Sequence, residues 1–197
     1  MSNTHPTMLS PPIIPPLLQS TALIAPSLYT GFTFAYTHAL LPPLLSHAPP
    51  KLLARQWLQA YQFAPVYVAP LILLGLASNT LLAIMSPSYN YLYAVAALLN
   101  ASVIAYTALY MEPGVNGAGK WKVREMLRGE DRVGKKEWVV GRQGTGKDTA
   151  REEWKIWAES VDMCVIVECW GRANAVRYVV AGVAVGLSAM ATVGGRM

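Results

Sequence analysis

The 197-residue chain is 53% hydrophobic and only 14% charged, which is roughly half the charged fraction of a typical soluble domain. No Asp, Glu, Lys or Arg occurs from Met1 to Pro50, and after Lys51 and Arg55 none occurs before Glu112. A soluble protein needs charges at intervals to solvate its surface, so this pattern excludes an ordinary cytosolic enzyme, a nucleic-acid-binding module and a disordered chain, and the net charge of +5 does not indicate a DNA partner.

Four apolar segments are long enough to cross a bilayer, whose ~30 Å hydrocarbon layer needs about 20 helical residues. We expect these spans at residues 17–41, 60–85, 91–110 and 173–193. Pro42, Pro43, Pro49 and Pro50 are expected to stop the first span and to shape the connection that follows it. Pro65 and Pro70 predict a kink inside the second, which membrane helices tolerate where neighbouring groups satisfy the freed backbone.

One polar segment, residues 112–172, separates the third span from the fourth. It holds all eleven acidic residues and twelve of the sixteen basic residues, interleaved as on a solvated helix surface. Residues 118–128 predict a short amphipathic helix, residues 148–172 predict a longer one that runs into the fourth span, and the Gly- and Lys-rich residues 129–147 are expected to be mobile. We therefore expect one all-α integral membrane domain over residues 1–197: a four-transmembrane-helix bundle with a long amphipathic cytosolic helical insert between helices three and four.

The orientation in the membrane follows from the Lys and Arg residues, which concentrate on the cytosolic side. The connection over residues 46–58 holds Lys51 and Arg55, and residues 112–172 hold the twelve basic residues counted above. Both connections should therefore face the cytosol, with both termini on the other side. The endoplasmic reticulum or another endomembrane is the expected location.

Three patterns resemble functional motifs, but none is expected to have that function here. The run Gly141 to Thr149 is close to a phosphate-binding loop, but Asp148 stands where Ser or Thr should follow Lys147 to hold magnesium. Cys164 and Cys169 are five residues apart and would point in different directions on a helix, so we expect free thiols. No two of the three histidines have metal-ligand spacing, and no metal site is expected.

Trp170, Asn174 and Arg177 follow the i, i+4, i+7 spacing that places side chains on one face of a helix. They lie where the insert enters the fourth span. One interpretation is an interfacial tryptophan beside an arginine that reaches toward the headgroups. Because Asn174 lies between them on the same face, a functional site is an equally good interpretation.

The start of the second span carries a similar arrangement. Arg55 precedes an aromatic face that includes Trp57 and Tyr61. Because this helix enters the membrane from the same side as the fourth span, Arg55 and Arg177 can meet at one depth. The alternative is that Arg55 contacts lipid phosphate.

His38 lies near the end of the first span. A histidine at membrane depth is rare and costly, so it is by default a candidate functional residue. Since only about three residues separate it from the end of the span, it can also simply reach the interface.

Three motifs in order resemble the anthrone oxygenase family, which comprises small four-helix membrane proteins, many encoded with fungal polyketide pathways. They are Arg55-Gln56-Trp57 with Tyr61, then Met111-Glu112-Pro113 with Asn116-Gly117-Ala118 and Lys120-Trp121-Lys122, and finally Trp170-x-x-x-Asn174-x-x-Arg177. The resemblance covers roughly residues 20–193, and the insert at 129–147 is not part of the family pattern.

The resemblance implies oxidation of an anthrone to an anthraquinone by dioxygen, with dioxygen as co-substrate and no other cofactor. The expected partners are an aromatic polyketide substrate and the lipid bilayer, with a homo-oligomer or pathway enzymes as possible further partners. Such an enzyme must remove a methylene proton, stabilise the enolate oxygen and exclude water. The implied roles are a base for His38, enolate stabilisation for Arg55 and Arg177, ring stacking for Trp57, Tyr61 and Trp170, and orientation of the carbonyl or a peroxide for Asn116 and Asn174.

Two alternatives remain open at the level of sequence. The chain can be a non-catalytic membrane adaptor or scaffold that docks through residues 112–172, or an enzyme that performs another enolate reaction, such as isomerisation or ring closure. A cavity distinguishes an enzyme from an adaptor: an enzyme should have an apolar pocket onto which His38 or the two arginines converge. An adaptor should have a filled bundle and a conspicuous surface patch.

The four-span topology predicts that the N-terminus and the insert lie on opposite sides of the membrane. In a background without Cys164 and Cys169, Asn3→Cys and Gln143→Cys should react with an impermeant thiol reagent from opposite sides. Labelling of both positions from the same side would contradict the four-span topology.

Overall fold

The computed structural model describes residues 13–86, 88–128 and 149–194, and the regular elements in these ranges are all helical. The expected mobile segment 129–147, and most of the run that resembles a phosphate-binding loop, lie outside them. In chain order the elements are α1 (Ile14–Ala35), the π-helix η1 (Tyr36–Leu40), α2 (Leu41–His47), α3 (Pro50–Tyr67), α4 (Ala69–Met85), α5 (Asn90–Tyr106), the π-helix η2 (Thr107–Asn116), α6 (Gly117–Met126), α7 (Glu152–Ser160) and α8 (Met163–Gly194).

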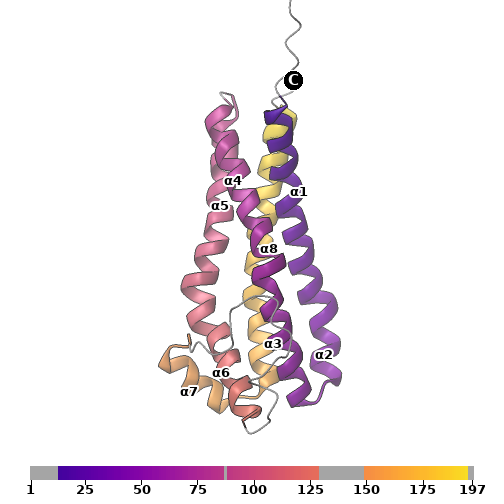
Figure 1. The fold of residues 1–197 in the computed structure, drawn as a ribbon, viewed down its shortest axis with the longest axis vertical. Helices are drawn as coiled ribbons and strands as arrows, with labels where there is room; N and C mark the ends of the chain where they lie inside the picture. Colours follow the sequence, from indigo (N-terminus) through magenta and orange to yellow (C-terminus); the bar gives the residue numbers. More distant parts are fainter. Residues whose placement is uncertain (1–12, 87, 129–148, 195–197) are drawn as a thin grey trace, which may run out of the picture.

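Helices α1, α4, α5 and α8 run side by side and form an elongated bundle (Figure 1). Helix α1 packs against α4 and α8, and α5 packs against the same two helices, so the four close into a ring. At one end of the bundle α3 continues the column of α4, and the short helices α6 and α7 pack against each other. This end contains the largest hydrophobic cluster, which is built around Trp57, Met111, Met163, Ile166 and Trp170.

Polar side chains link the helices inside the bundle. The Ser188 hydroxyl on α8 donates a hydrogen bond of 2.8 Å to Asn79 Oδ1 on α4. The hydroxyl oxygen of Tyr93 on α5 lies 3.0 Å from the hydroxyl oxygen of Thr192 on α8, within hydrogen-bond distance. Because an unpaired polar group in an apolar interior is costly, these pairs favour one register of α8 against its neighbours.

Among the described residues, two helices are long and apolar enough to cross a membrane: Asn90–Met126, which joins α5, η2 and α6, and Met163–Gly194, which is α8. Helix α4, Ala69–Met85, is apolar but shorter. These features suggest association with a membrane. The all-α fold class expected from the sequence is therefore confirmed for the described residues, whereas the crossing of a membrane by four helices stays a prediction.

The helix of the first expected span does not stop at Pro42 and Pro43, so the prediction was wrong for this pair of prolines. Helix α1 passes through η1 into α2, whose first turn contains Pro42 and Pro43. Proline is tolerated there because the first turn of a helix has no internal partner for the backbone N–H. The helical column ends at Ala48, directly before Pro49 and Pro50, as predicted for these two prolines. The Ala48 backbone is extended (φ −79°, ψ 128°), which is usual before a proline.

The second expected span is interrupted, as its prolines predict. Helix α3 ends at Tyr67, and α4 begins at Ala69 with Pro70 in its first turn. Val68, between the two helices, departs from ideal helical geometry (φ −99°, ψ −42°). The missing N–H of Pro70 explains the interruption, because it removes one hydrogen bond from a continuous helix.

The insert is only partly as expected. Helix α6 confirms the short helix predicted over residues 118–128. The longer helix predicted over 148–172 is instead two helices, because Val161 after α7 adopts an extended conformation (φ −127°, ψ 160°). Helix α8 then begins at Met163 and runs unbroken to Gly194. Both cysteines lie on α8 as free thiols, as expected.

The close approach of α6 to Trp57 predicts a specific glycine requirement. A Cβ atom added to Gly119 would lie only 2.3 Å from the Trp57 ring, which is 1% exposed and has little room to move. Gly119→Ala should therefore destabilise the protein by about 1–3 kcal/mol through overpacking. Thermal unfolding of the purified protein in detergent measures this change.

The matched control is Gly186→Ala on α8, where an added Cβ atom meets nothing within 4 Å. This variant should be as stable as the parent or slightly more stable, because alanine is more favourable than glycine inside a helix by about 1 kcal/mol. Equal stability of the two variants would contradict the packing described here.

Candidate functional site

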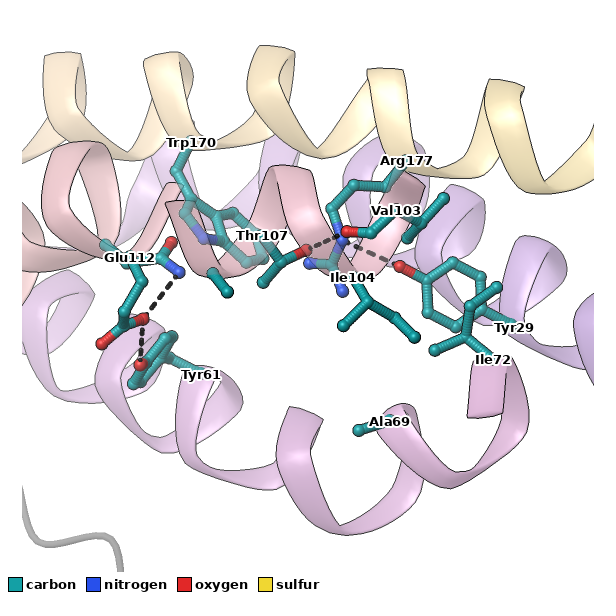
Figure 2. Close-up of a pocket in the computed structure, with 12 residues that line it drawn as sticks. Tyr29, Tyr61, Ala69, Ile72, Val103, Ile104, Thr107, Glu112, Trp170 and Arg177 are labelled. Carbon is teal, nitrogen blue, oxygen red and sulfur yellow. Dashed lines mark hydrogen bonds between the residues drawn. The ribbon is translucent and has the colours of Figure 1, made fainter. Parts of the chain in front are cut away.

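An apolar pocket of about 330 Å³ lies inside the bundle, where α3 meets α4 and where α5 passes into η2. Its volume falls in the range of ~300–1,000 Å³ typical of small-molecule sites. Figure 2 shows Arg177 at one end of the pocket and Glu112 at the other. The lining residues are Tyr29, Tyr61, Ala69, Ile72, Val103, Ile104, Thr107, Ala108, Glu112, Asn116, Trp170 and Arg177.

The π-helix η2 supplies a third of this lining, namely Thr107, Ala108, Glu112 and Asn116. Pro113 lies inside η2, and Gly114 leaves helical geometry (φ −97°, ψ −116°), so the regular hydrogen bonding of the helix cannot continue there. π-helical segments are frequent at functional sites. Here the irregular segment brings polar side chains against an otherwise apolar bundle.

A second hollow, a groove of about 710 Å³, lies on the other side of η2, against α7 and α8. Its lining includes Trp154, Trp157, Glu153 and Arg172. The charged side chains of this groove are largely exposed, with Arg172 at 81%. The smaller pocket is the better candidate site, because its charged groups are less exposed than those of the groove and converge on one space.

Arg177 forms the cationic end of the pocket. Its Nε donates a hydrogen bond of 2.8 Å to the Tyr29 hydroxyl, and its Nη1 donates one of 3.1 Å to Asn174 Oδ1. The guanidinium also lies 5.5 Å from the centre of the Tyr29 ring. Among the described residues no carboxylate pairs with Arg177, and three of its five N–H groups have no protein partner.

Asn174 fixes the position of this arginine. Its Nδ2 donates to the Thr37 hydroxyl at 2.9 Å and to the Thr33 carbonyl oxygen at 3.4 Å. Asn174 is 2% exposed, so these contacts are shielded from water. The amide is therefore oriented by the α1 column, and its oxygen is presented to Arg177. Asn174 thus positions the guanidinium rather than lining the pocket itself.

Glu112 forms the anionic end of the pocket, and four side chains donate hydrogen bonds to it. Its Oε1 accepts from Lys120 Nζ at 2.5 Å and from the Thr149 hydroxyl at 3.1 Å. Its Oε2 accepts from the Tyr61 hydroxyl at 2.7 Å and from Asn116 Nδ2 at 3.2 Å. Lys120 is only 6% exposed and lies over the Tyr61 ring, so this carboxylate–ammonium pair is largely shielded from water.

These donors determine the charge of Glu112, which lies beyond the third expected span. Burial raises the pKa of the Glu112 carboxyl, but hydrogen bonds from Lys120 and Tyr61 and the charge of Lys120 outweigh burial. Its pKa consequently lies below the usual range, and Glu112 is an anion at neutral pH. The pocket therefore has a fixed cation at one end and a fixed anion at the other.

Aromatic side chains hold the wall between the two ends. Trp170 contacts Tyr36 and Trp57 edge to face, at interplanar angles of 78° and 87°. Trp57 stacks on Tyr61 with ring centres 5.6 Å apart. Trp57 does not line the pocket but supports Tyr61 and Trp170, which do. Of the three rings expected to stack on a substrate, two therefore reach the pocket.

The structure does not bring the other two candidates to this pocket. His38 is exposed on the α1 column, where its Nε2 lies 2.9 Å from the Tyr178 hydroxyl and its ring packs on Phe34. Arg55 is exposed on α3. Neither residue lines the pocket. Of His38, Arg55 and Arg177, which were expected to converge on one pocket, only Arg177 reaches it.

Sequence reasoning gave three members of the site no role, although two of them, Glu112 and Lys120, lie in the motif that resembles the family. Glu112 was assigned to a solvated helix surface with the other acids, although it is the first acid after a long stretch without charges. Lys120 was treated as one of many basic residues of the insert. Tyr29 carries no signal in the sequence, because its importance arises only from its contact with Arg177, 148 residues away.

Within the part of the chain that the structure describes, no group of three or more His, Cys, Asp or Glu side chains could hold a metal ion. That finding concerns metal ions alone. The expected absence of any cofactor other than the co-substrate dioxygen stays a prediction.

The family assignment rests on comparison with known proteins. A family model described as anthrone oxygenase matches residues 57–187, which is well over half of the chain. Comparisons with curated proteins and with solved structures give no match. The matched region contains all of the pocket except Tyr29, including both charged ends. On this match, the chain belongs to the anthrone oxygenase family.

Proposed function

We propose that the protein oxidises an anthrone-type aromatic polyketide to the corresponding quinone with dioxygen, through an enolate held in the pocket. Membership of the family suggests an oxygenase-like function. The single observation that carries the finer proposal is the placement of Arg177 and Glu112 at opposite ends of one apolar pocket (Figure 2). The substrate's own geometry explains why that placement matters.

In an anthrone the carbonyl oxygen and the reactive methylene carbon lie across the central ring from each other. An enzyme that polarises the carbonyl and removes a methylene proton therefore needs its donor and its base on opposite sides of a flat cavity. Arg177 and Glu112 satisfy this requirement. Trp170 and Arg177, which both line the pocket, are seven positions apart on α8, or about 10 Å along the helix axis, so this wall is long enough to face a ring system.

Arg177 is suited to stabilising the enolate oxygen. Its guanidinium is already oriented by Tyr29 and Asn174, so little rearrangement is needed when charge develops on the substrate. It has no competing carboxylate among the described residues. An oxyanion would thus supply the counter-charge that the protein does not.

Glu112 is suited to accepting the proton. Its hydrogen bond from Asn116 to Oε2, at 3.2 Å, is the longest of the contacts to its carboxylate oxygens and therefore the easiest to give up. A carboxylate with a low pKa can still act as a base where a preformed oxyanion site stabilises the enolate. We assign the base to Glu112 rather than to His38, because His38 does not line the pocket.

The overall reaction then balances. Glu112 takes one methylene proton, and the enolate passes one electron to dioxygen. The resulting radical pair forms a carbon–oxygen bond, and the peroxide regains a proton. Loss of the second hydrogen as a proton converts the carbon–oxygen bond to a carbonyl while the O–O bond breaks, and the oxygen that leaves ends as water.

We also propose that the four columns of the bundle cross an endomembrane. Two helices in the described ranges have the length and composition needed, and large apolar side chains such as Leu98, Val183 and Met190 are exposed along α5 and α8. A flat aromatic polyketide partitions into a bilayer and would reach the pocket from there. A bundle with a pocket inside is harder to reconcile with a purely structural adaptor, which needs no such cavity.

The oxyanion role predicts a strong effect at Arg177. Arg177→Gln should lower turnover of an anthrone by ~10²–10³, the usual cost of losing one well-placed oxyanion donor. Arg177→Lys should restore little, because lysine lacks the planar fork of N–H groups. Oxygen uptake by membranes containing equal amounts of each protein measures the effect.

Arg172→Gln is the matched control, since Arg172 lies five residues earlier on α8 and is 81% exposed. It should keep the parental turnover. Full activity of Arg177→Gln would exclude the proposed enolate site.

The base role predicts that Glu112→Gln loses turnover by ~10²–10⁴. Because this change leaves Lys120 buried without its partner, the double variant Glu112→Gln with Lys120→Met serves as the control for stability. The double variant should accumulate normally and remain inactive. Substantial activity in either protein would assign the base elsewhere, and His38→Gln would then be the variant to examine.

A further inference from the structure

Several buried polar groups in the bundle have no protein partner, and two of them belong to the pocket. Within the described residues, Trp170 Nε1 and Asn116 Oδ1 are buried atoms without a hydrogen bond. Trp170 is 6% exposed and Asn116 is 3% exposed, and both line the pocket. Other unpartnered groups, such as those of Asn100, lie outside its lining.

An unpartnered buried donor or acceptor costs free energy, so native proteins rarely keep one without a reason. In a pocket the usual reason is that a ligand supplies the partner. Trp170 offers a donor, since the indole N–H cannot accept a hydrogen bond. Asn116 offers an acceptor, because its Nδ2 is directed to Glu112 and its oxygen remains for another group.

The packing of Trp170 favours contact with a ligand through the N–H edge of its ring. Edge-to-face contacts with Tyr36 and Trp57 hold the indole from two directions, so the ring cannot easily turn its face to a substrate. In Figure 2 the indole nitrogen lies on the side of the ring nearest Glu112. The free donor and the free acceptor thus both belong to the end of the pocket where the base is found.

We propose that Trp170 and Asn116 form a peroxide-binding subsite at the Glu112 end of the pocket. The inference rests on the proposed function. With the carbonyl at Arg177, the methylene carbon faces Glu112, and dioxygen must add to that carbon. A hydroperoxide formed there has one oxygen that can accept from the Trp170 N–H and an O–H that can donate to Asn116 Oδ1. A free donor and a free acceptor in the lining of one pocket match both needs.

The subsite has a defined task in the reaction. When the enolate passes an electron to dioxygen, a small anion forms next to a carbon radical. A hydrogen bond from Trp170 keeps that anion beside the radical until the carbon–oxygen bond closes. Without the subsite, superoxide escapes and disproportionates to hydrogen peroxide and dioxygen, and two carbon radicals couple to a dimer.

The test separates proton removal from the oxygen steps. Under argon, exchange of the methylene hydrogens of anthrone with deuterated water measures proton removal alone. In air, quinone formation, hydrogen peroxide and coupled dimer are measured on the same membranes, and membranes without the protein give the uncatalysed background. Trp170→Phe keeps an aromatic ring but removes the N–H group. Asn116→Ala removes the acceptor and serves as the second variant where Trp170→Phe does not accumulate.

We expect Trp170→Phe to keep deuterium exchange within about twofold of the parent, while quinone formation falls about tenfold or more and hydrogen peroxide and dimer appear. Asn116→Ala should change the ratio of quinone formation to exchange in the same direction. The matched control is Trp157→Phe in the separate groove, which should leave both rates and the products unchanged.

Three results would overturn the inference. If both variants form quinone at the parental rate and release no more hydrogen peroxide than the parent, neither group is needed. A parallel loss of exchange and quinone formation would place them in proton removal or substrate binding instead. If the parent protein neither exchanges nor oxidises anthrone, the proposed function itself fails, and the subsite fails with it.

Discussion

The site depends on one arginine, Arg177, which has no acidic partner among the residues that the structure describes. Arg177 lies within the apolar bundle, and its contacts are a phenol, an amide and the face of an aromatic ring. Because neutral groups orient a guanidinium but do not neutralise it, the cation remains available for an anion that forms during a reaction. Tyr29 and Asn174, together with the threonines that hold Asn174, are thus best understood as supports for this one charge.

The irregular helices give this cation a counterpart across the pocket. A regular helix through Pro113 and Gly114 would continue the apolar column, whereas η2 places Glu112 and Asn116 at the pocket and lets α6 turn Lys120 back onto the carboxylate. The same short region therefore supplies the anion, fixes its charge and leaves an unpaired amide oxygen. The irregular helix η2 is short, but it places the charged and polar groups of Glu112 and Asn116 at the pocket.

The sequence predicted the parts of the molecule that depend on local patterns. The lengths of the apolar segments predicted the four helical columns of the bundle. The i, i+4, i+7 spacing correctly placed Trp170, Asn174 and Arg177 on one face of a helix. It could not reveal that Tyr29 meets Arg177 or that Lys120 pairs with Glu112, because such contacts depend on packing between distant segments. For the same reason, nothing local could show that His38 and Arg55 lie outside the lining of the pocket while Glu112 belongs to it.

A structure of the protein with bound 9,10-anthraquinone would test the central claim most directly. The account predicts that the quinone lies in the pocket between Tyr61 and Trp170, with one carbonyl oxygen about 3 Å from a nitrogen of Arg177 and the other directed toward Glu112. A quinone bound instead in the groove beside Trp154 and Trp157, or in the pocket with neither carbonyl near Arg177, would contradict it.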